Sequence, residues 1–162
     1  MKYDIKNIIT SFDITDDITL VTICRLPNNT TAVAKVFTCF AENDINIDMI
    51  SLLASSASHQ NVSFTARGKD LCLVLAAIGS LKETFTDIRT NVSSANCKIT
   101  FAGKQVEKNS GVAAYIFEAF AKHEVDLLLV TTSETEISCL LDEAGTQLLK
   151  TVLAEEFDVS QC

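Results

Sequence analysis

The feature that most constrains the fold of this chain is an internal duplication. The segments Thr30–Ile50 and Ser110–Val130 align without gaps at an offset of 80 residues. Identical residues at matching positions are the pairs Ala34 and Ala114, Phe37 and Phe117, Phe40 and Phe120, and Ala41 and Ala121. Because large residues recur at the same phase, we expect the chain to contain two copies of one structural unit.

In both copies, the spacing of apolar residues changes from a helical period to a strand period in the same order. A helical stripe with apolar residues at i, i+3, i+4 and i+7 comes first, and in copy one it consists of Val33, Val36, Phe37 and Phe40. Alternating apolar residues then predict a half-buried strand, which begins at Ile45 in copy one and at Val125 in copy two. A preceding strand, a second alternating strand and a second helix complete the copy. With one closing strand, this order is the ferredoxin-like βαββαβ arrangement.

The predicted fold class is therefore α+β, with two ferredoxin-like units, each an antiparallel sheet with helices on one face. Copy one is preceded by a strand at 18–23 and closed by one near 86–91, and copy two is preceded by a strand at 99–101. Copy two has no closing strand of its own, and the strand-like residues 7–12 have no place in copy one. We expect them to fill the open sheet position. Residues 18–92 then form a first unit inserted into a second unit of residues 1–17 plus 93–162.

Composition and charge exclude several classes of function. The 21 acidic and 13 basic residues give a net charge of −8, which repels phosphate backbones and anionic lipids. We therefore expect no nucleic-acid partner and no membrane partner. No apolar run approaches the roughly 20 residues that cross a bilayer, and the N-terminal residues do not resemble a signal peptide. The six cysteines have no paired spacing, which is typical of reduced thiols, so we expect a cytoplasmic protein.

The sequence shows no pattern typical of catalysis, of a cofactor or of a metal site. The five glycines form neither of the common phosphate-binding motifs, so no cofactor is expected. His59 and His123 lack the spacing of metal ligands and are expected to be surface residues. Since no nucleophile motif occurs either, the chain is not expected to be an enzyme on its own.

A polar turn precedes each of the repeated helices, at Pro27–Thr31 and at 108–111. The first N–H groups of a helix are unpaired and carry positive partial charge, which suits a free carboxylate. We expect the following strand to begin beside this turn, so that Asn46 and Asp48, or Asp126, hold an ammonium group. The carboxylate and the ammonium group of a free amino acid would then both have binding partners here. The alternative is that Thr30 or Ser110 simply caps its helix.

Three segments of the sequence match a known pattern. Ile45–Ile50 has the sequence I-N-I-D-M-I, Gly111–Phe120 has G-V-A-A-Y-I-F-E-A-F, and Thr131–Ser138 has T-T-S-E-T-E-I-S. These segments resemble the C-terminal regulatory region of the aspartokinases (aspartate kinases), which is a tandem pair of ACT domains. The resemblance runs from about Ile9 to Phe157, and it includes aspartokinase regulatory subunits that are made as separate chains.

The resemblance implies regulation by end-product amino acids. In this family lysine or threonine binds where ACT units pair, often between chains, and shifts the kinase between active and inhibited states. The implied partners are lysine or threonine as effector, an aspartate kinase catalytic domain or subunit, and a second copy of the chain in a homodimer. The catalytic domain of the family, with its phosphate-binding motif, has no counterpart in these residues.

The resemblance also implies effector contacts, residue by residue. They are Asn28, Asn29, Thr30, Thr31, Asn46, Ile47 and Asp48 in the first unit, and Asp126, Leu127, Ser133 and Glu134 in the second. Thr31 stands where the family turn has glycine, and Leu52 stands where its strand has glutamine. These two departures keep open an alternative function, that of an ACT-type dimerisation module whose ligand site is degenerate.

Overall fold

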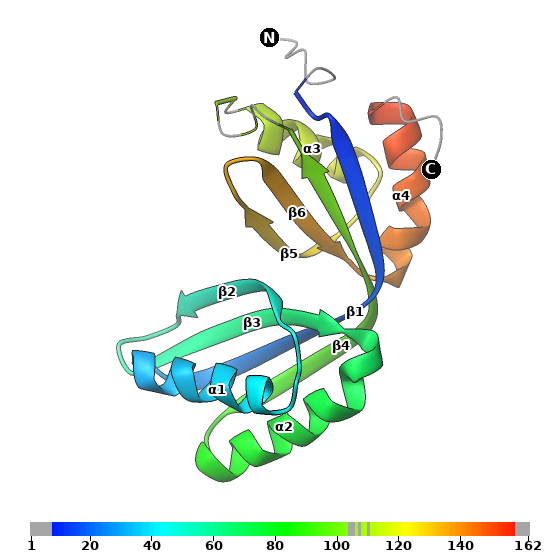
Figure 1. The fold of residues 1–162 in the computed structure, drawn as a ribbon. Coiled ribbons are helices and arrows are strands. Elements are labelled where there is room, and N and C mark those ends of the chain that lie inside the picture. The colour runs from blue at the N-terminus through cyan, green and yellow to red at the C-terminus, as the bar shows by residue number, and fades with distance from the viewer. Residues whose placement is uncertain (1–7, 104–105, 107, 110, 158–162) are drawn as a thin grey trace. The chain divides into compact units, whose positions relative to one another are not determined.

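A computed structural model of the chain describes residues 8–103, 106, 108–109 and 111–157 (Figure 1). Its elements are β1 (Ser11–Pro27), α1 (Thr30–Glu42), β2 (Asp48–Ala54), β3 (His59–Arg67), a 3₁₀ turn (Gly68–Asp70), α2 (Leu71–Thr84), β4 (Arg89–Ala102), α3 (Gly111–Lys122), β5 (Leu127–Thr132), β6 (Glu136–Leu141) and α4 (Glu143–Glu156). None of the helices in the described residues is both long and apolar enough to cross a membrane.

The described residues divide into two compact units. The first unit consists of residues 17–95, and the second unit consists of residues up to Asp16 together with those from Asn96 onward. Both β1 and β4 contribute one part to each unit, so the sheet of each unit has four strands.

The first unit has the strand order β2–β3–β1–β4, and α1 and α2 cover one face of its sheet (Figure 1). β3 pairs antiparallel with both β1 and β2. Side chains that alternate along the strands meet the helical stripes in one core, which includes Val21, Ile23, Val36, Phe40, Val62, Phe64, Val74 and Ile78. Of the predicted helical stripe, Val36 and Phe40 are buried in this core, whereas Val33 and Phe37 are partly buried and pack against it.

The second unit repeats this arrangement with the strand order β1–β4–β6–β5 and the helices α3 and α4. Ile9 is part of its core, and the Phe12 ring lies 5.4 Å from Phe101 and 5.7 Å from Phe157 between ring centroids. The N–H of Thr10 donates to the carbonyl of Ala102 at 2.8 Å. The predicted fold class is confirmed: both units are ferredoxin-like, with helices on one face of an antiparallel sheet.

The boundaries of two predicted strand pairs are wrong. Residues 7–12 and 18–23 were expected as separate strands, as were 86–91 and 99–101. Instead β1 begins at Ser11 and continues through 18–23, and β4 begins at Arg89 and continues through 99–101. Residue 7 lies outside the described residues. The apolar alternation lapses between the segments, but each strand continues between them. Asp17 in β1 and Ala95 in β4 are the residues at which each strand changes from one unit to the other. Their φ angles are 56° and 60°, in the left-handed region that non-glycine residues rarely adopt.

The duplication extends to the way in which α1 and α3 end. The N–H of Ile45 donates to the carbonyl of Phe40 at 3.1 Å, and the N–H of Val125 donates to that of Phe120 at 2.9 Å. The residue before each of these donors has a left-handed φ, of 55° and 56° respectively. The prediction that a strand begins at Ile45 is wrong for this reason, because that residue still closes the helix and β2 starts only at Asp48.

Gly103 gives a test of how the N-terminal residues pack. A Cβ atom at Gly103 would overlap the backbone carbonyl of Ile8, whereas a Cβ atom at Gly79 on α2 would meet nothing within 4 Å. We expect Gly103→Ala to lower the free energy of unfolding by about 1–3 kcal/mol, because backbone must move to admit the methyl group. Gly79→Ala should raise it by up to about 1 kcal/mol through helix propensity. Urea unfolding measures both, and a neutral Gly103→Ala would contradict this packing.

Candidate functional site

The turn before α1 is built around Asn29. Asn29 has an extended backbone, and its side-chain Oδ1 accepts a hydrogen bond from the N–H of Ala32 at 2.8 Å. Asn29 is therefore the N-cap, and the alternative that Thr30 caps this helix is wrong by one residue. Ser110, the equivalent residue in the second unit, lies outside the described residues. Thr30 and Thr31 are exposed and form the first positions of α1, where backbone N–H groups precede any intrahelical acceptor.

Hydrogen bonds fix this turn to the connection between β2 and β3. Asn28 donates from Nδ2 to the carbonyls of Ser56 and Ala57 at 3.3 and 3.4 Å. Gln60, only 4% exposed, donates from Nε2 to the carbonyls of Pro27 and Asn29 at 2.7 and 3.2 Å. The amide side chains of Asn28 and Gln60 thus hold the start of α1 beside the end of β2.

The other predicted contacts of the first unit lie at the opposite end of β2. Asn46 is exposed, Ile47 packs against the core, and Asp48 is the first residue of the strand. Oδ1 of Asp48 accepts a hydrogen bond from the N–H of Met49 at 2.8 Å, and Met49 has φ of 48°. The strand therefore begins with an exposed carboxylate beside an irregular backbone.

The length of the elements keeps the two polar groups apart. α1 has 13 residues and β2 has seven, and each of these elements spans about 20 Å. The expectation that the strand begins beside the turn is wrong. The turn lies at the start of α1, whereas β2 begins after the other end of that helix. Within one unit, Asn28–Thr31 and Asn46–Asp48 therefore cannot hold the same amino acid.

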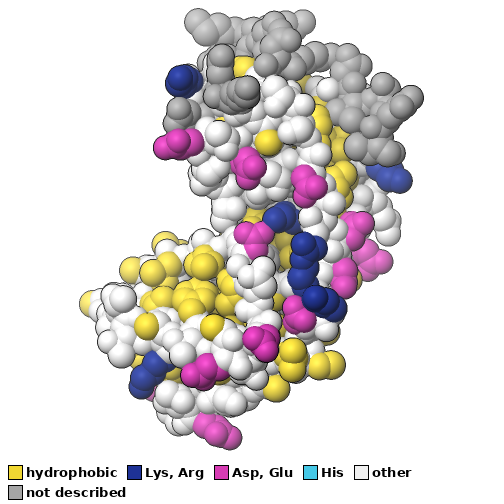
Figure 2. Space-filling view, in the orientation of Figure 1, with side chains coloured by type: hydrophobic (Ala, Val, Ile, Leu, Met, Phe, Trp, Pro, Cys, Tyr) yellow, Lys and Arg dark blue, Asp and Glu magenta, His cyan; other side chains and the backbone are white. Residues whose placement is uncertain are grey.

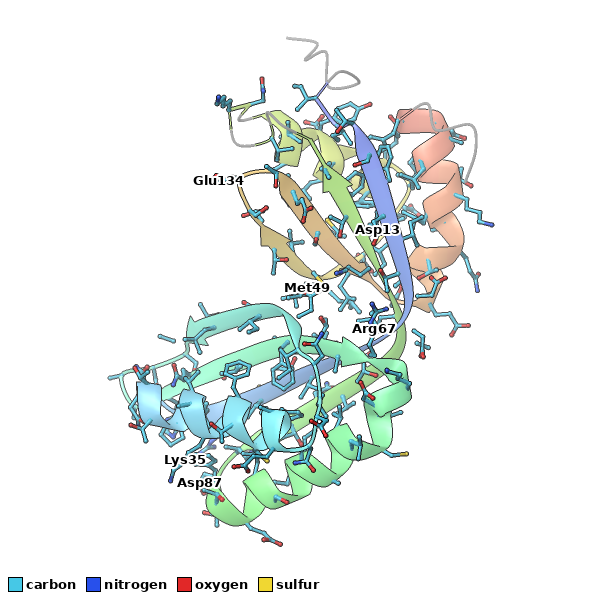
Figure 3. All side chains as sticks on the ribbon, viewed as in Figure 1. Asp13, Lys35, Met49, Arg67, Asp87 and Glu134 are labelled. Carbon is cyan, nitrogen blue, oxygen red and sulfur yellow. The ribbon has the colours of Figure 1, made fainter. Side chains whose placement is uncertain are left out.

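The four predicted residues of the second unit are divided in the same way. Asp126 is exposed just before β5, and Leu127 begins the strand. Ser133 and Glu134 lie in the turn between β5 and β6, where Figure 3 labels Glu134. Oγ of Ser133 accepts a hydrogen bond from the N–H of Glu136 at 3.1 Å, so its hydroxyl shapes the turn. The six residues of β5 separate the two pairs by about 20 Å.

Sequence patterns did not predict a groove between α1 and α2. It has a volume of about 440 Å³, and its lining includes the hydroxyl side chains of Thr31, Thr38, Ser80 and Thr84 and the charged side chains of Lys35 and Glu42. Cys39 lies in the same lining, and burial followed by the charge of Glu42 raises the pKa of its thiol. The groove therefore presents hydroxyl groups, two opposite charges and a protonated thiol.

A charged cluster in the second unit was also missed. Nε2 of His123 lies 3.1 Å from Oε1 of Glu156 and 3.7 Å from Oε2 of Glu155. The His123 side chain is only 14% exposed, so its prediction as a surface residue is wrong. These three residues offer ligand atoms within 4.8 Å of one another, but Nζ of Lys122 also binds Oε1 of Glu156. The cluster is thus an ion-pair network between the ends of α3 and α4.

Comparisons with known proteins agree with the fold. A model of the ACT domain matches residues 99–157. An aspartokinase of Bacillus sp. (strain MGA3) is 33% identical over 147 residues, which cover 90% of this chain and 35% of that relative. The chain belongs to the aspartokinase family, as an ACT-type regulatory region. It spans about a third of the length of the curated relatives that it matches, and their catalytic region has no counterpart in its residues.

Two solved structures show the same fold as this aspartokinase regulatory region. The regulatory subunit of aspartate kinase from Thermus thermophilus, in its ligand-free form, has a TM-score of 0.79 at 22% identity, covering 92% of this chain and 98% of that one. E. coli aspartokinase III in complex with lysine and aspartate has a TM-score of 0.70 at 18% identity, covering 93% of this chain and 33% of that one. At these identities the likeness concerns the fold alone.

The ion-pair network of this aspartokinase regulatory region predicts a pH dependence. Hydrogen bonds from Lys122 and then from His123 lower the pKa of Glu156. A carboxylate with a lowered folded-state pKa stabilises the fold above its unfolded pKa of about 4.3, and this contribution disappears as the pH falls through the folded pKa.

We therefore expect the urea midpoint of the native chain to fall more between about pH 6 and pH 3 than that of Glu156→Gln. Glu118→Gln, on the exposed side of α3, is the matched control and should keep the native slope. Equal slopes for the native chain and Glu156→Gln would show that the network does not contribute.

Proposed function

We propose that this chain senses lysine or threonine and that the bound amino acid regulates an aspartate kinase in the cytoplasm. Family membership supports the regulatory role, and E. coli aspartokinase III, which shares the fold, was solved with lysine and aspartate. The observation that carries the proposal is the position of two complementary polar groups at the two ends of the edge strand β2. We assign the first ACT unit to residues 18–92 and the second to residues 1–17 plus 93–162.

The turn before α1 supplies the half of the site that suits a carboxylate. Thr30 and Thr31 present the first N–H groups of α1, and the helix dipole adds positive potential there. The side chains of Asn28 and Asn29 are already used, for the β2–β3 connection and for the cap. Their role is to hold the backbone donors in place rather than to bind the ligand.

The start of β2 supplies the half that suits an ammonium group. Asp48 carries the carboxylate, with the exposed amide of Asn46 beside it. Asp126 occupies the position equivalent to Asn46 in the second unit, so both units place polar side chains just before the edge strand. An effector with a cationic side chain, such as lysine, also benefits from these acidic groups.

A second copy of the chain brings the two halves together. β2 is the edge strand of the first unit, and Ile50, Leu52 and Leu53 are 52%, 52% and 66% exposed on it. Figure 2 shows apolar side chains gathered on the first unit beside β2. An unpaired edge with apolar side chains is typical of a surface that a partner covers. Antiparallel pairing of β2 with its copy sets the start of each strand against the end of the other.

This pairing forms two equivalent effector sites in a homodimer. Each site has Asn28–Thr31 from one chain and Asn46–Asp48 from the other. By the same reasoning, β5 is the edge strand of the second unit, and its pairing joins Asp126 and Leu127 of one chain to Ser133 and Glu134 of the other. Because the effector contacts two chains at once, it binds the paired state more tightly.

Regulation then follows from linkage between binding and assembly. An effector that prefers one assembly state by a few kcal/mol shifts the population of that state, and a kinase domain or subunit attached to it shifts as well. The second candidate function is a dimerisation module with a degenerate ligand site. Two observations favour that alternative: Thr31 adds a side chain at the helix start, and the exposed Leu52 adds apolar surface to the pairing edge.

Thermal-shift titration with amino acids tests the proposal. We expect lysine or threonine to stabilise the chain, by about 2.7 kcal/mol when the free ligand exceeds its Kd a hundredfold. Asp48→Ala and Asp126→Ala should weaken this response, because each removes a carboxylate that faces the ammonium group. Glu83→Ala, on the exposed side of α2, is the control and should respond like the native chain.

Sedimentation of the native chain and of Leu52→Lys separates the two candidate functions. A chain that dimerises through Leu52 but responds to no amino acid is a dimerisation module. A chain that remains monomeric with and without effector contradicts the pairing on which both candidates depend.

A further inference from the structure

The first unit contains a second, smaller cavity that neither half of the effector site uses. It lies between the end of β1, the start of β3 and the segment that joins α2 to β4, and its volume is about 200 Å³. All of its lining residues fall within 17–95, so one chain forms it completely. We call it the Arg25 cavity.

One wall of the Arg25 cavity is cationic. The pairing of β1 with β3 shifts register between Ile23 and Leu26, and Arg25 in this bulge has a left-handed φ of 61°. Its N–H donates to Oδ1 of Asn61 at 3.3 Å, which holds the bulge. Within the part of the chain that the structure describes, no carboxylate pairs with the guanidinium group of Arg25. A strained residue of this kind is found often at ligand sites.

His59 lies on the same side of the cavity. It is the first residue of β3 and pairs with Pro27, and both residues line the cavity. Nδ1 of His59 lies 2.9 Å from Oγ of Ser58, which fixes the orientation of the ring. A guanidinium group with an oriented imidazole beside it is a favourable environment for a carboxylate.

The facing wall is anionic. α2 ends at Thr84, and the N–H of Phe85 donates a hydrogen bond to the carbonyl of Leu81 at 2.8 Å. Among the described residues, the backbone carbonyls of 82–84 accept no hydrogen bond, and the end of a helix carries negative partial charge. Asp87, which Figure 3 labels near the end of α2, adds a full negative charge to this wall.

Pro27, Phe85 and Ile88 add apolar groups to the lining of the cavity. We propose that the Arg25 cavity binds a free α-amino acid as its zwitterion. In this arrangement the carboxylate lies against Arg25 and His59, the ammonium group lies against Asp87 and the end of α2, and an apolar side chain contacts Phe85 or Ile88. Since one chain forms the cavity, this binding needs no second copy and is separate from the effector site proposed above.

Nuclear magnetic resonance titration of the isotope-labelled full chain tests this assignment. Each common L-amino acid is added, and for L-valine the analogues 3-methylbutanoate and isobutylamine are added as well, since each lacks one of the two charges. We expect saturable shifts of the amides of Arg25, His59 and 84–88 with at least one amino acid. The two analogues of valine should bind at least tenfold more weakly than valine.

Matched variants locate the binding. Arg25→Gln and Asp87→Asn should each weaken it at least tenfold, while Arg67→Gln and Asp70→Asn, elsewhere on the same unit, should not change it. Arg25→Lys keeps the positive charge but lacks the planar guanidinium group, so it should weaken binding less than Arg25→Gln. A graded loss of this kind shows that the charge matters, whereas a misfolded variant would lose binding in both cases. Asp48→Ala, at the effector site, should leave these shifts unchanged.

Three results would overturn the assignment. The first is the absence of saturable shifts at the cavity with every amino acid. The second is binding of 3-methylbutanoate as tight as that of valine, which would show a simple anion site. The third is equal weakening by Arg67→Gln and Arg25→Gln, which would show that net charge rather than the cavity attracts the ligand.

Discussion

The strand β2 separates the two polar groups of the first unit by its whole length, and the proposed effector site depends on this separation. A free amino acid is far shorter than the roughly 20 Å that seven extended residues span. Hydrogen bonds from Asn28 and Gln60 hold the turn at the start of α1 at the end of β2 that is far from Asp48. In the proposed function, the edge of a second chain therefore supplies the other half of the site. Under this proposal, binding of the effector depends on the assembly of two chains.

The fold supplies such edges twice because the unit is duplicated. Both copies end their first helix with the same hydrogen bond to a phenylalanine carbonyl, and both then enter an edge strand with a polar residue just before it. The N-terminal residues close the sheet of the second unit, where Ile9 and Phe12 join the core beside Phe101. β1 and β4 each contribute residues to both units.

Periodicity predicted the helices, the strands and the fold class, because burial on one face of a helix or strand leaves a local pattern in the sequence. The ends of elements were predicted less well, since Ile45 has an apolar side chain that suits a strand while its N–H still closes α1. The site residues were named from resemblance, but their division between the two ends of β2 came only from the structure. His123 and Glu156, and likewise Arg25 and Asp87, are far apart in sequence, and no local pattern indicates that the fold brings each pair to one place.

Mixing two defective chains tests most directly whether each effector site is shared between chains. One chain carries Asp48→Ala and keeps its turn, and the other carries Thr31→Trp, which blocks the turn and keeps Asp48. Each variant alone should bind no effector at the shared site by calorimetry. After the two are mixed and allowed to exchange, every mixed dimer should contain one intact site, and binding with the native affinity should return. If mixing restores no binding while mixed dimers form, the site does not join the turn of one chain to the strand of another, and the account is wrong.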